Sequence, residues 1–228
     1  MRHGAVAFRP IAVAAALVAL AGCNGGDTGR DRSERIFDAA RSGDVGAIEA
    51  LIVDGAQVDA RDDAGRTPLI VAADAGQTLA ARALLDGGAD VNAVDANGDS
   101  AYPFAALSDA PELVGLLLDR GSDRIGTTQF GGTPLIAASD RGYIEVVRAI
   151  LARPDIPIDH VNDLGWTALL EAIILGDGDS AHVEIVGLLI DAGANVNLAD
   201  REGVTPLRHA QRRGYAAMVR RLKAAGAK

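Results

Sequence analysis

A short motif returns along most of this chain at a nearly fixed interval. Each copy has an anchor glycine two residues before a Thr or Ser, and the anchors are Gly65, Gly98, Gly131, Gly165 and Gly203. Their spacings are 33, 33, 34 and 38 residues. A repeat of this period predicts a stack of similar units, each of which buries its apolar face against its neighbours.

The residues after each anchor indicate the start of a short helix. A Thr or Ser can cap a free backbone N–H, and Pro fits the first turn because its missing N–H costs nothing there. A small residue then allows close packing between helices. The triplets are Thr67-Pro68-Leu69, Ser100-Ala101-Tyr102, Thr133-Pro134-Leu135, Thr167-Ala168-Leu169 and Thr205-Pro206-Leu207, and the small residues are Ala72, Ala105, Ala138, Ala172 and Ala210.

A glycine-containing turn follows most of the first helices, at Gly76, Gly142, Gly176 and Gly214. An aliphatic stretch such as 79–85 or 144–151 then predicts a second helix. Extended turns at 88–93 and 193–198, which we call fingers, lead to the next anchor.

This pattern resembles the ankyrin repeat, with its TPL-x-x-A helix start and its GADVNA-like finger. The resemblance covers residues 33–228 and implies an all-α solenoid of about six helix-turn-helix units with short β-hairpin-like fingers. The expected units are 33–61, 62–94, 95–127, 128–161, 162–199 and 200–228, of which the first and last act as caps.

Several positions depart from the family pattern. The His that usually follows the triplet is replaced by Ile70, Pro103, Ile136, Leu170 and Arg208. The hydrogen bonds of that His must therefore be absent or replaced. The unit at 95–127 is the most degenerate, and the extra residues of the longer spacings fall at 153–158, in a finger, and at 175–182, between two helices.

The first residues predict an export signal. Residues 1–22 combine Arg2 and Arg9 with an apolar run, and the sequence up to Cys23 resembles the lipobox of bacterial lipoproteins. We therefore expect lipidation of Cys23, a flexible tether at 23–32, and anchoring on the periplasmic side, with Asn24 favouring the outer membrane. The alternative is cleavage after Ala21, which would leave a soluble periplasmic protein.

Charge and residue types narrow the classes of function. The net charge of −9 argues against nucleic acid as a partner, because that affinity depends on Lys and Arg contacts to phosphate. His160, His182 and His209 lie in separate contexts without metal-ligand spacing, and Asp177-Gly178-Asp179-Ser180 lacks the later ligands of a calcium loop. We expect no catalytic set, no metal and no cofactor, and a solvated, flexible insertion around 176–181.

The resemblance also places the partner site. Variable positions of the family lie beside the anchor glycine and after the Ala pair, on a concave face. Here an apolar group occurs at such positions, and apolar surface patches often mark interfaces. The predicted site is Phe130, Leu164, Trp166, Ile174 and Leu175, edged by Asp140, Arg141, Arg212 and Arg213. The alternative is that Trp166 folds onto its own finger while Ile174 and Leu175 pack under the insertion.

The predicted function is a non-catalytic module that binds a protein partner and is monomeric by itself. Two versions are an immunity-type inhibitor of a toxic enzyme and an accessory factor of a periplasmic enzyme such as a catalase. Both are roles of exported bacterial proteins with this repeat. The alternatives are an envelope scaffold with several weak partners and an enzyme with an unrecognised site.

Overall fold

The computed structural model describes residues 29–126 and 131–228, and within these ranges every regular element is a helix. The all-α prediction and the predicted number of units are confirmed, because the helices form six consecutive pairs. The helices are α1 (Gly29–Ser42), α2 (Val45–Val53), α3 (Pro68–Asp74), α4 (Thr78–Asp86), α5 (Ala101–Leu107), α6 (Pro111–Asp119), α7 (Pro134–Arg141), α8 (Ile144–Leu151), α9 (Ala168–Ile174), α10 (Ser180–Asp191), α11 (Pro206–Arg212) and α12 (Ala216–Ala224).

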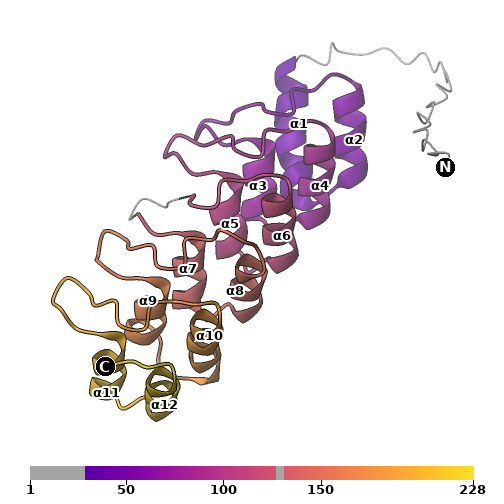
Figure 1. Cartoon of the computed structure of the whole chain (residues 1–228). Coiled ribbons are helices and arrows are strands. Elements are labelled where there is room, and N and C mark those ends of the chain that lie inside the picture. Colours follow the sequence, from indigo (N-terminus) through magenta and orange to yellow (C-terminus); the bar gives the residue numbers. More distant parts are fainter. Residues whose placement is uncertain (1–28, 127–130) are drawn as a thin grey trace, which may run out of the picture.

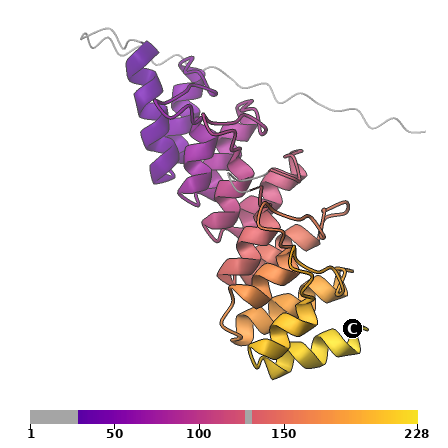
Figure 2. The ribbon, with the colours of Figure 1, turned by 90° about the vertical axis from the view of Figure 1, so that its left-hand side faces the viewer.

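The pairs stack in two rows (Figure 1). The first helices of successive units, α1, α3, α5, α7, α9 and α11, lie side by side, and so do the second helices from α2 to α12. The fingers that connect the units project on the side of the first helices, which faces the viewer in Figure 2. The substantial helix contacts join neighbouring units, as a repeat stack requires.

The helix starts follow the capping prediction with one exception. Thr67, Thr133, Thr167 and Thr205 each accept a hydrogen bond from the backbone N–H three residues later, at 3.2 to 3.4 Å. Ser100 has the same extended backbone, but its side chain makes no cap bond to α5. Pro103 lies in the first turn of α5, where its ring is tolerated.

The turn after the first helix requires a left-handed residue. Gly142 ends α7 with φ of 73°, a conformation that costs glycine little. The third unit has Asp109 at this place, with φ of 50°. Asp is one of the few residues with a side chain that adopts this region readily.

Small and aliphatic side chains fill the core. The five Ala residues after the triplets are fully buried, which allows the first helices of neighbouring units to approach closely. Ile70 and Leu170, which replace the usual His, are also fully buried. Four of the five positions that lack the family's His are therefore buried and apolar, whereas Arg208 is exposed.

The fingers are hairpin-like, as expected, and contain no regular strand within the described ranges. The turn at 62–66, for example, is closed by a backbone bond from Asp62 N–H to Arg66 O (3.1 Å). One expectation needs adjustment at the edge of the first unit. Residues 29–32, expected in the tether, form the first turn of α1. The predicted signal, Cys23 and Phe130 lie outside the described residues. None of the described helices is long and apolar enough to cross a bilayer.

Candidate protein-binding face

In four of the fingers, one Asp or Asn holds the fingertip. Asp62 Oδ1 accepts from the backbone N–H groups of Ala64 (3.0 Å) and Arg66 (2.9 Å). Asn162 Oδ1 accepts in the same way from Leu164 and Trp166, both at 3.0 Å. The pattern recurs at Asp95 and Asp200. These bonds fix the backbone of the tip, so the side chains beside the anchor glycine have a defined position.

A second set of bonds ties each finger to the next, and we call each such contact a finger seam. Asn92 Oδ1 accepts from the N–H of Asp123 (2.8 Å), and Asp159 Oδ1 accepts from the N–H of Asn195 (2.9 Å). Asp59 and Asn197 have the same role. Between the third and fourth units, the two corresponding positions are Ile125, whose side chain has no acceptor, and Pro157, whose backbone has no N–H. This seam therefore lacks the bond that the other seams form.

A histidine bond lies beside this missing seam bond. His160 Nε2 lies 2.7 Å from the carbonyl oxygen of Gly131 and must donate to it, because a carbonyl only accepts. Both residues belong to the fourth unit, so this bond holds two fingers together without replacing the bond from the third unit to the fourth.

The predicted partner site is partly assembled. Leu164, at a fingertip, and Leu175, just after α9, are 52% and 51% exposed. Trp166 is half-buried. Ile174 is only 9% exposed, so its predicted contribution to an exposed patch is wrong, as the alternative interpretation foresaw. In the fifth unit, the residue seven positions after the helix cap is therefore buried.

The charged edge of that site lies on the same row of first-helix ends. Arg141, Arg212 and Arg213 are exposed, whereas Asp140 is half-buried. The carbonyl oxygen of Asp140 receives a hydrogen bond from His182, which belongs to the next unit. We call the surface formed by the fingertips and the ends of the first helices the finger face.

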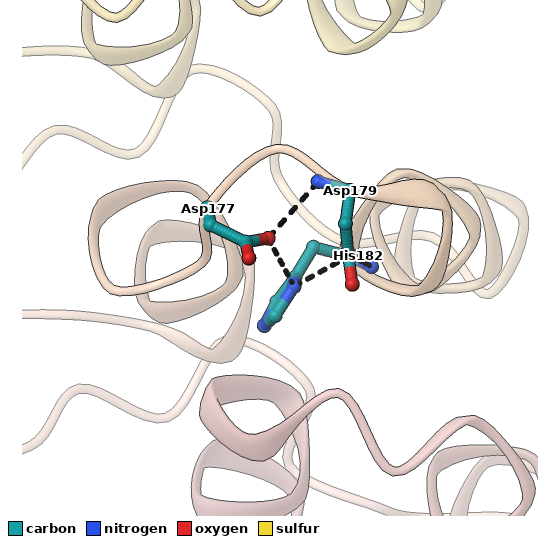
Figure 3. Close-up of side chains that lie close together, drawn as sticks. All are labelled: Asp177, Asp179 and His182. Atoms are coloured by element: carbon teal, nitrogen blue, oxygen red, sulfur yellow. Dashed lines mark hydrogen bonds and ion pairs between the residues drawn. The ribbon is translucent and has the colours of Figure 1, made fainter.

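The insertion between α9 and α10 is tied to both neighbouring units, contrary to the expectation of a flexible, solvated segment. Asp179 caps α10 by accepting from the N–H of His182 (2.8 Å). The His182 ring bonds Asp179 Oδ1 through Nδ1 (2.9 Å) (Figure 3). It also bonds the Asp140 carbonyl through Nε2 (3.0 Å). On the other side, the Tyr215 hydroxyl donates to the Gly176 carbonyl (3.0 Å).

Asp177, Asp179 and His182 are also the one group in the described ranges whose ligand atoms are close enough for a metal ion (Figure 3). The hydrogen bonds do not fit that role. Both ring nitrogens of His182 face oxygen atoms that can only accept, so both carry protons and neither offers a lone pair. Burial of the ring lowers the pKa of His182. The Asp140 carbonyl and the Asp179 carboxylate together raise this pKa by more than burial lowers it, so the net shift is upward.

Two polar pairs at the base of the fingers, one buried and one half-buried, were missed by the sequence analysis. In the fifth unit the Asn162 amide donates to Glu171 Oε1 (2.7 Å), and in the sixth His209 Nε2 contacts Asp200 Oδ2 (2.7 Å). Burial raises the pKa of Glu171 to about 7, against the lowering effect of the Asn162 bond. The sequence did contain a signal for the first pair, because Glu171 is the one charged residue in the otherwise apolar helix α9.

The comparisons with known proteins agree with this architecture. A family model described as ankyrin repeats (3 copies) matches residues 36–128, 104–200 and 135–228. The ankyrin repeat protein YahD of Escherichia coli (strain K12) is 35% identical over 189 residues, which make up 83% of this chain and 94% of YahD.

Two solved structures are similar over most of the chain. An ankyrin repeat domain from Acinetobacter baumannii AYE has a TM-score of 0.80 and 46% identity, with 85% of this chain and 98% of that chain covered. A chain in the structure of a predatory endopeptidase from Bdellovibrio bacteriovorus in complex with an immunity protein has a TM-score of 0.70 and 26% identity, with 84% and 98% covered.

Proposed function

The chain belongs to the ankyrin-repeat family, and from that membership we propose that it is an exported, non-catalytic protein that binds and modulates one periplasmic protein. Ankyrin repeats are protein–protein interaction modules, and most are not catalytic. The proposal adds export by the signal at 1–22, anchoring through a lipid on Cys23, and a partner site on the finger face, which is the concave face of the family.

One observation carries the partner site. Leu164 and Leu175 are large apolar side chains that stay half-exposed on a surface whose backbone is fixed by hydrogen bonds. Apolar groups on a rigid surface lose little conformational freedom when a partner covers them, so their burial contributes directly to affinity. Trp166 follows Leu164 by two residues in the same finger, and Trp is enriched among the residues that dominate interface energies.

An immunity-type inhibitor of a toxic enzyme is the version that we favour over an accessory factor. The similarity to a chain in a complex of an endopeptidase with an immunity protein supports it. An inhibitor of this kind needs only a rigid surface that covers its target, which a stack of tied fingers supplies.

Purification of the full chain from the bacterial envelope tests the proposal. We expect the wild type to be recovered from the detergent-solubilised envelope with one partner, which mass spectrometry identifies. Trp166→Ala and Leu175→Ser should lose that partner at an unchanged melting temperature. Leu79→Ser is the matched control, because Leu79 is 68% exposed but lies on α4, a second helix.

Two outcomes contradict the proposal. Recovery of the protein in the cytoplasmic fraction would exclude export. Equal loss, or equal retention, of the partner in Leu175→Ser and Leu79→Ser would exclude the finger face as the binding surface.

A further inference from the structure

The charges of this chain are segregated along the stack. Residues 33–199 contain 10 Lys and Arg against 27 Asp and Glu. Residues 200–228, the last unit, contain eight Lys and Arg against two Asp and Glu. The molecule is therefore an acidic stack with a basic end, although its net charge is −9.

Several cations of the earlier units are paired with acidic groups, whereas the last unit has few acidic groups to pair with. Arg66, Arg120 and Arg153 each lie within 2.9 Å of a carboxylate oxygen of an Asp, although Arg82 and Arg141 are exposed without an ion pair in the described ranges. Arg201, Arg212 and Arg213 are exposed, and no ion pair to them occurs within the described ranges. Three guanidinium groups thus remain available to carboxylates from another molecule, for which their planar donors are well suited.

These arginines lie beside the exposed leucines. Arg212 and Arg213 follow the cap of α11 at the positions where Ile174 and Leu175 follow the cap of α9, and α9 packs against α11 (Figure 1). Arg201 has in its finger the position that Asp163, next to Leu164, has in the preceding finger. On the finger face, the exposed apolar residues of the fifth unit are therefore followed by exposed basic residues at corresponding positions of the sixth.

We infer that the partner presents an acidic segment next to apolar side chains, which dock on Arg201, Arg212 and Arg213 and on Leu164 and Leu175 respectively. This inference rests on the proposed function and specifies the partner's chemistry. The acidic earlier units oppose a long polyanion such as nucleic acid. A short protein segment confines its negative charge to the last unit, and screening over about 10 Å limits repulsion from the rest of the stack.

A random peptide display library, with inserts of about 12 residues, tests the inference without knowledge of the natural partner. We expect peptides selected on the wild type to be enriched in Asp or Glu next to Leu, Ile or Phe. The affinity of a selected, fluorescently labelled peptide should fall by at least about tenfold in Arg212→Glu/Arg213→Glu, since charge reversal replaces attraction by repulsion. Binding should also weaken as salt rises.

The control variant has the same change of charge on another helix. Arg220→Glu/Lys223→Glu alters two exposed cations of α12, and we expect it to leave the peptide affinity within about twofold of the wild type. Circular dichroism melting confirms that both double variants are folded. Equal loss in both variants would indicate attraction by net charge alone and would overturn the inference.

The remaining outcomes separate the inference from the proposed function. Selected peptides without acidic enrichment that still lose binding in Leu175→Ser would overturn the acidic segment and leave the finger face as a binding surface. If no selected peptide depends on Leu175 or on the arginines, both the inference and the finger face are contradicted.

Discussion

Polar side chains near the helix ends of the fifth unit have partners, whereas several in the third unit do not. In the fifth unit Asn162, Asp179 and His182 all make the bonds described above. In the third, Ser100 Oγ, Tyr102 OH, Ser122 Oγ and Arg124 Nε are buried and unpartnered, whereas among the described residues of the fifth unit only Glu171 Oε2 is. Both units depart from the repeat, but the fifth compensates more fully with new contacts. A departure from the repeat pattern therefore does not by itself predict whether a unit is less stable. The contacts that the altered residues make must also be known.

The largest effect on stability is expected from substitution of Gly176, the first residue of the insertion in the fifth unit. A Cβ on Gly176 would lie 2.3 Å from the Ala172 carbonyl oxygen and 2.6 Å from the His182 ring. Gly176→Ala should therefore displace His182 and lower the free energy of unfolding by about 3 kcal/mol, measured by urea denaturation.

Gly46→Ala is the control for that change. Gly46 lies in α2, and the nearest heavy atom to its added Cβ would be 3.7 Å away, an ordinary contact. Alanine should be neutral there or stabilise the helix by about 1 kcal/mol. If Gly176→Ala left the free energy of unfolding unchanged, the insertion would be able to shift and accommodate the added methyl group. The fifth unit would then not be the rigid part of the stack.

The next effect depends on pH. The pKa of Glu171 is about 7, above its ordinary value of 4.5, so stability due to the protonated form is fully present below about pH 4.5 and is lost as pH rises through 7. Glu171→Gln keeps the acceptor for Asn162 and removes the ionisation. We expect the variant to match the wild type at pH 4 and to be more stable by about 3 kcal/mol at pH 8.5.

Thermal and urea denaturation of both proteins across pH 4 to pH 8.5 measure that difference. His182 also has a raised pKa, but it is present in both proteins, so its contribution cancels in the comparison. Parallel curves for wild type and variant would mean that Glu171 is not the buried ionisable group of the fifth unit.

A pair of Tyr→Phe variants gives the smallest effect and the sharpest comparison of the two units. The Tyr102 hydroxyl is fully buried without a partner, so Tyr102→Phe should raise the free energy of unfolding by about 1 kcal/mol. The Tyr215 hydroxyl donates to Gly176 of the insertion, so Tyr215→Phe should lower it by a similar amount. Changes of the same sign would remove the contrast between the third and the fifth units.

The sequence predicted the helix pairs well because their signals are local. Thr67 and Thr133 cap the helices that they were expected to cap, and Ala72 and Ala138 are buried where close packing was expected. Capping and small-residue spacing act within a few residues, so they can be recognised along the chain.

The polar ties between units were harder to predict, because each joins residues about one repeat or more apart. The contact of His182 with the Asp140 carbonyl spans 42 residues, and that of Tyr215 with Gly176 spans 39. The burial of Ile174 was missed for a related reason, since register gives a position on a helix but not the direction of its side chain.

The seam between the third and fourth units has a mechanical consequence. If the proposed anchor held one end of the stack and a bound partner held the other, every seam between them would carry the same tension. At this seam Ile125 and Pro157 stand where the neighbouring fingers form their bond, and the His160 contact with Gly131 lies within the fourth unit. We therefore expect the finger side to open first at this seam under load, which would spare the tied fingers that hold the exposed leucines.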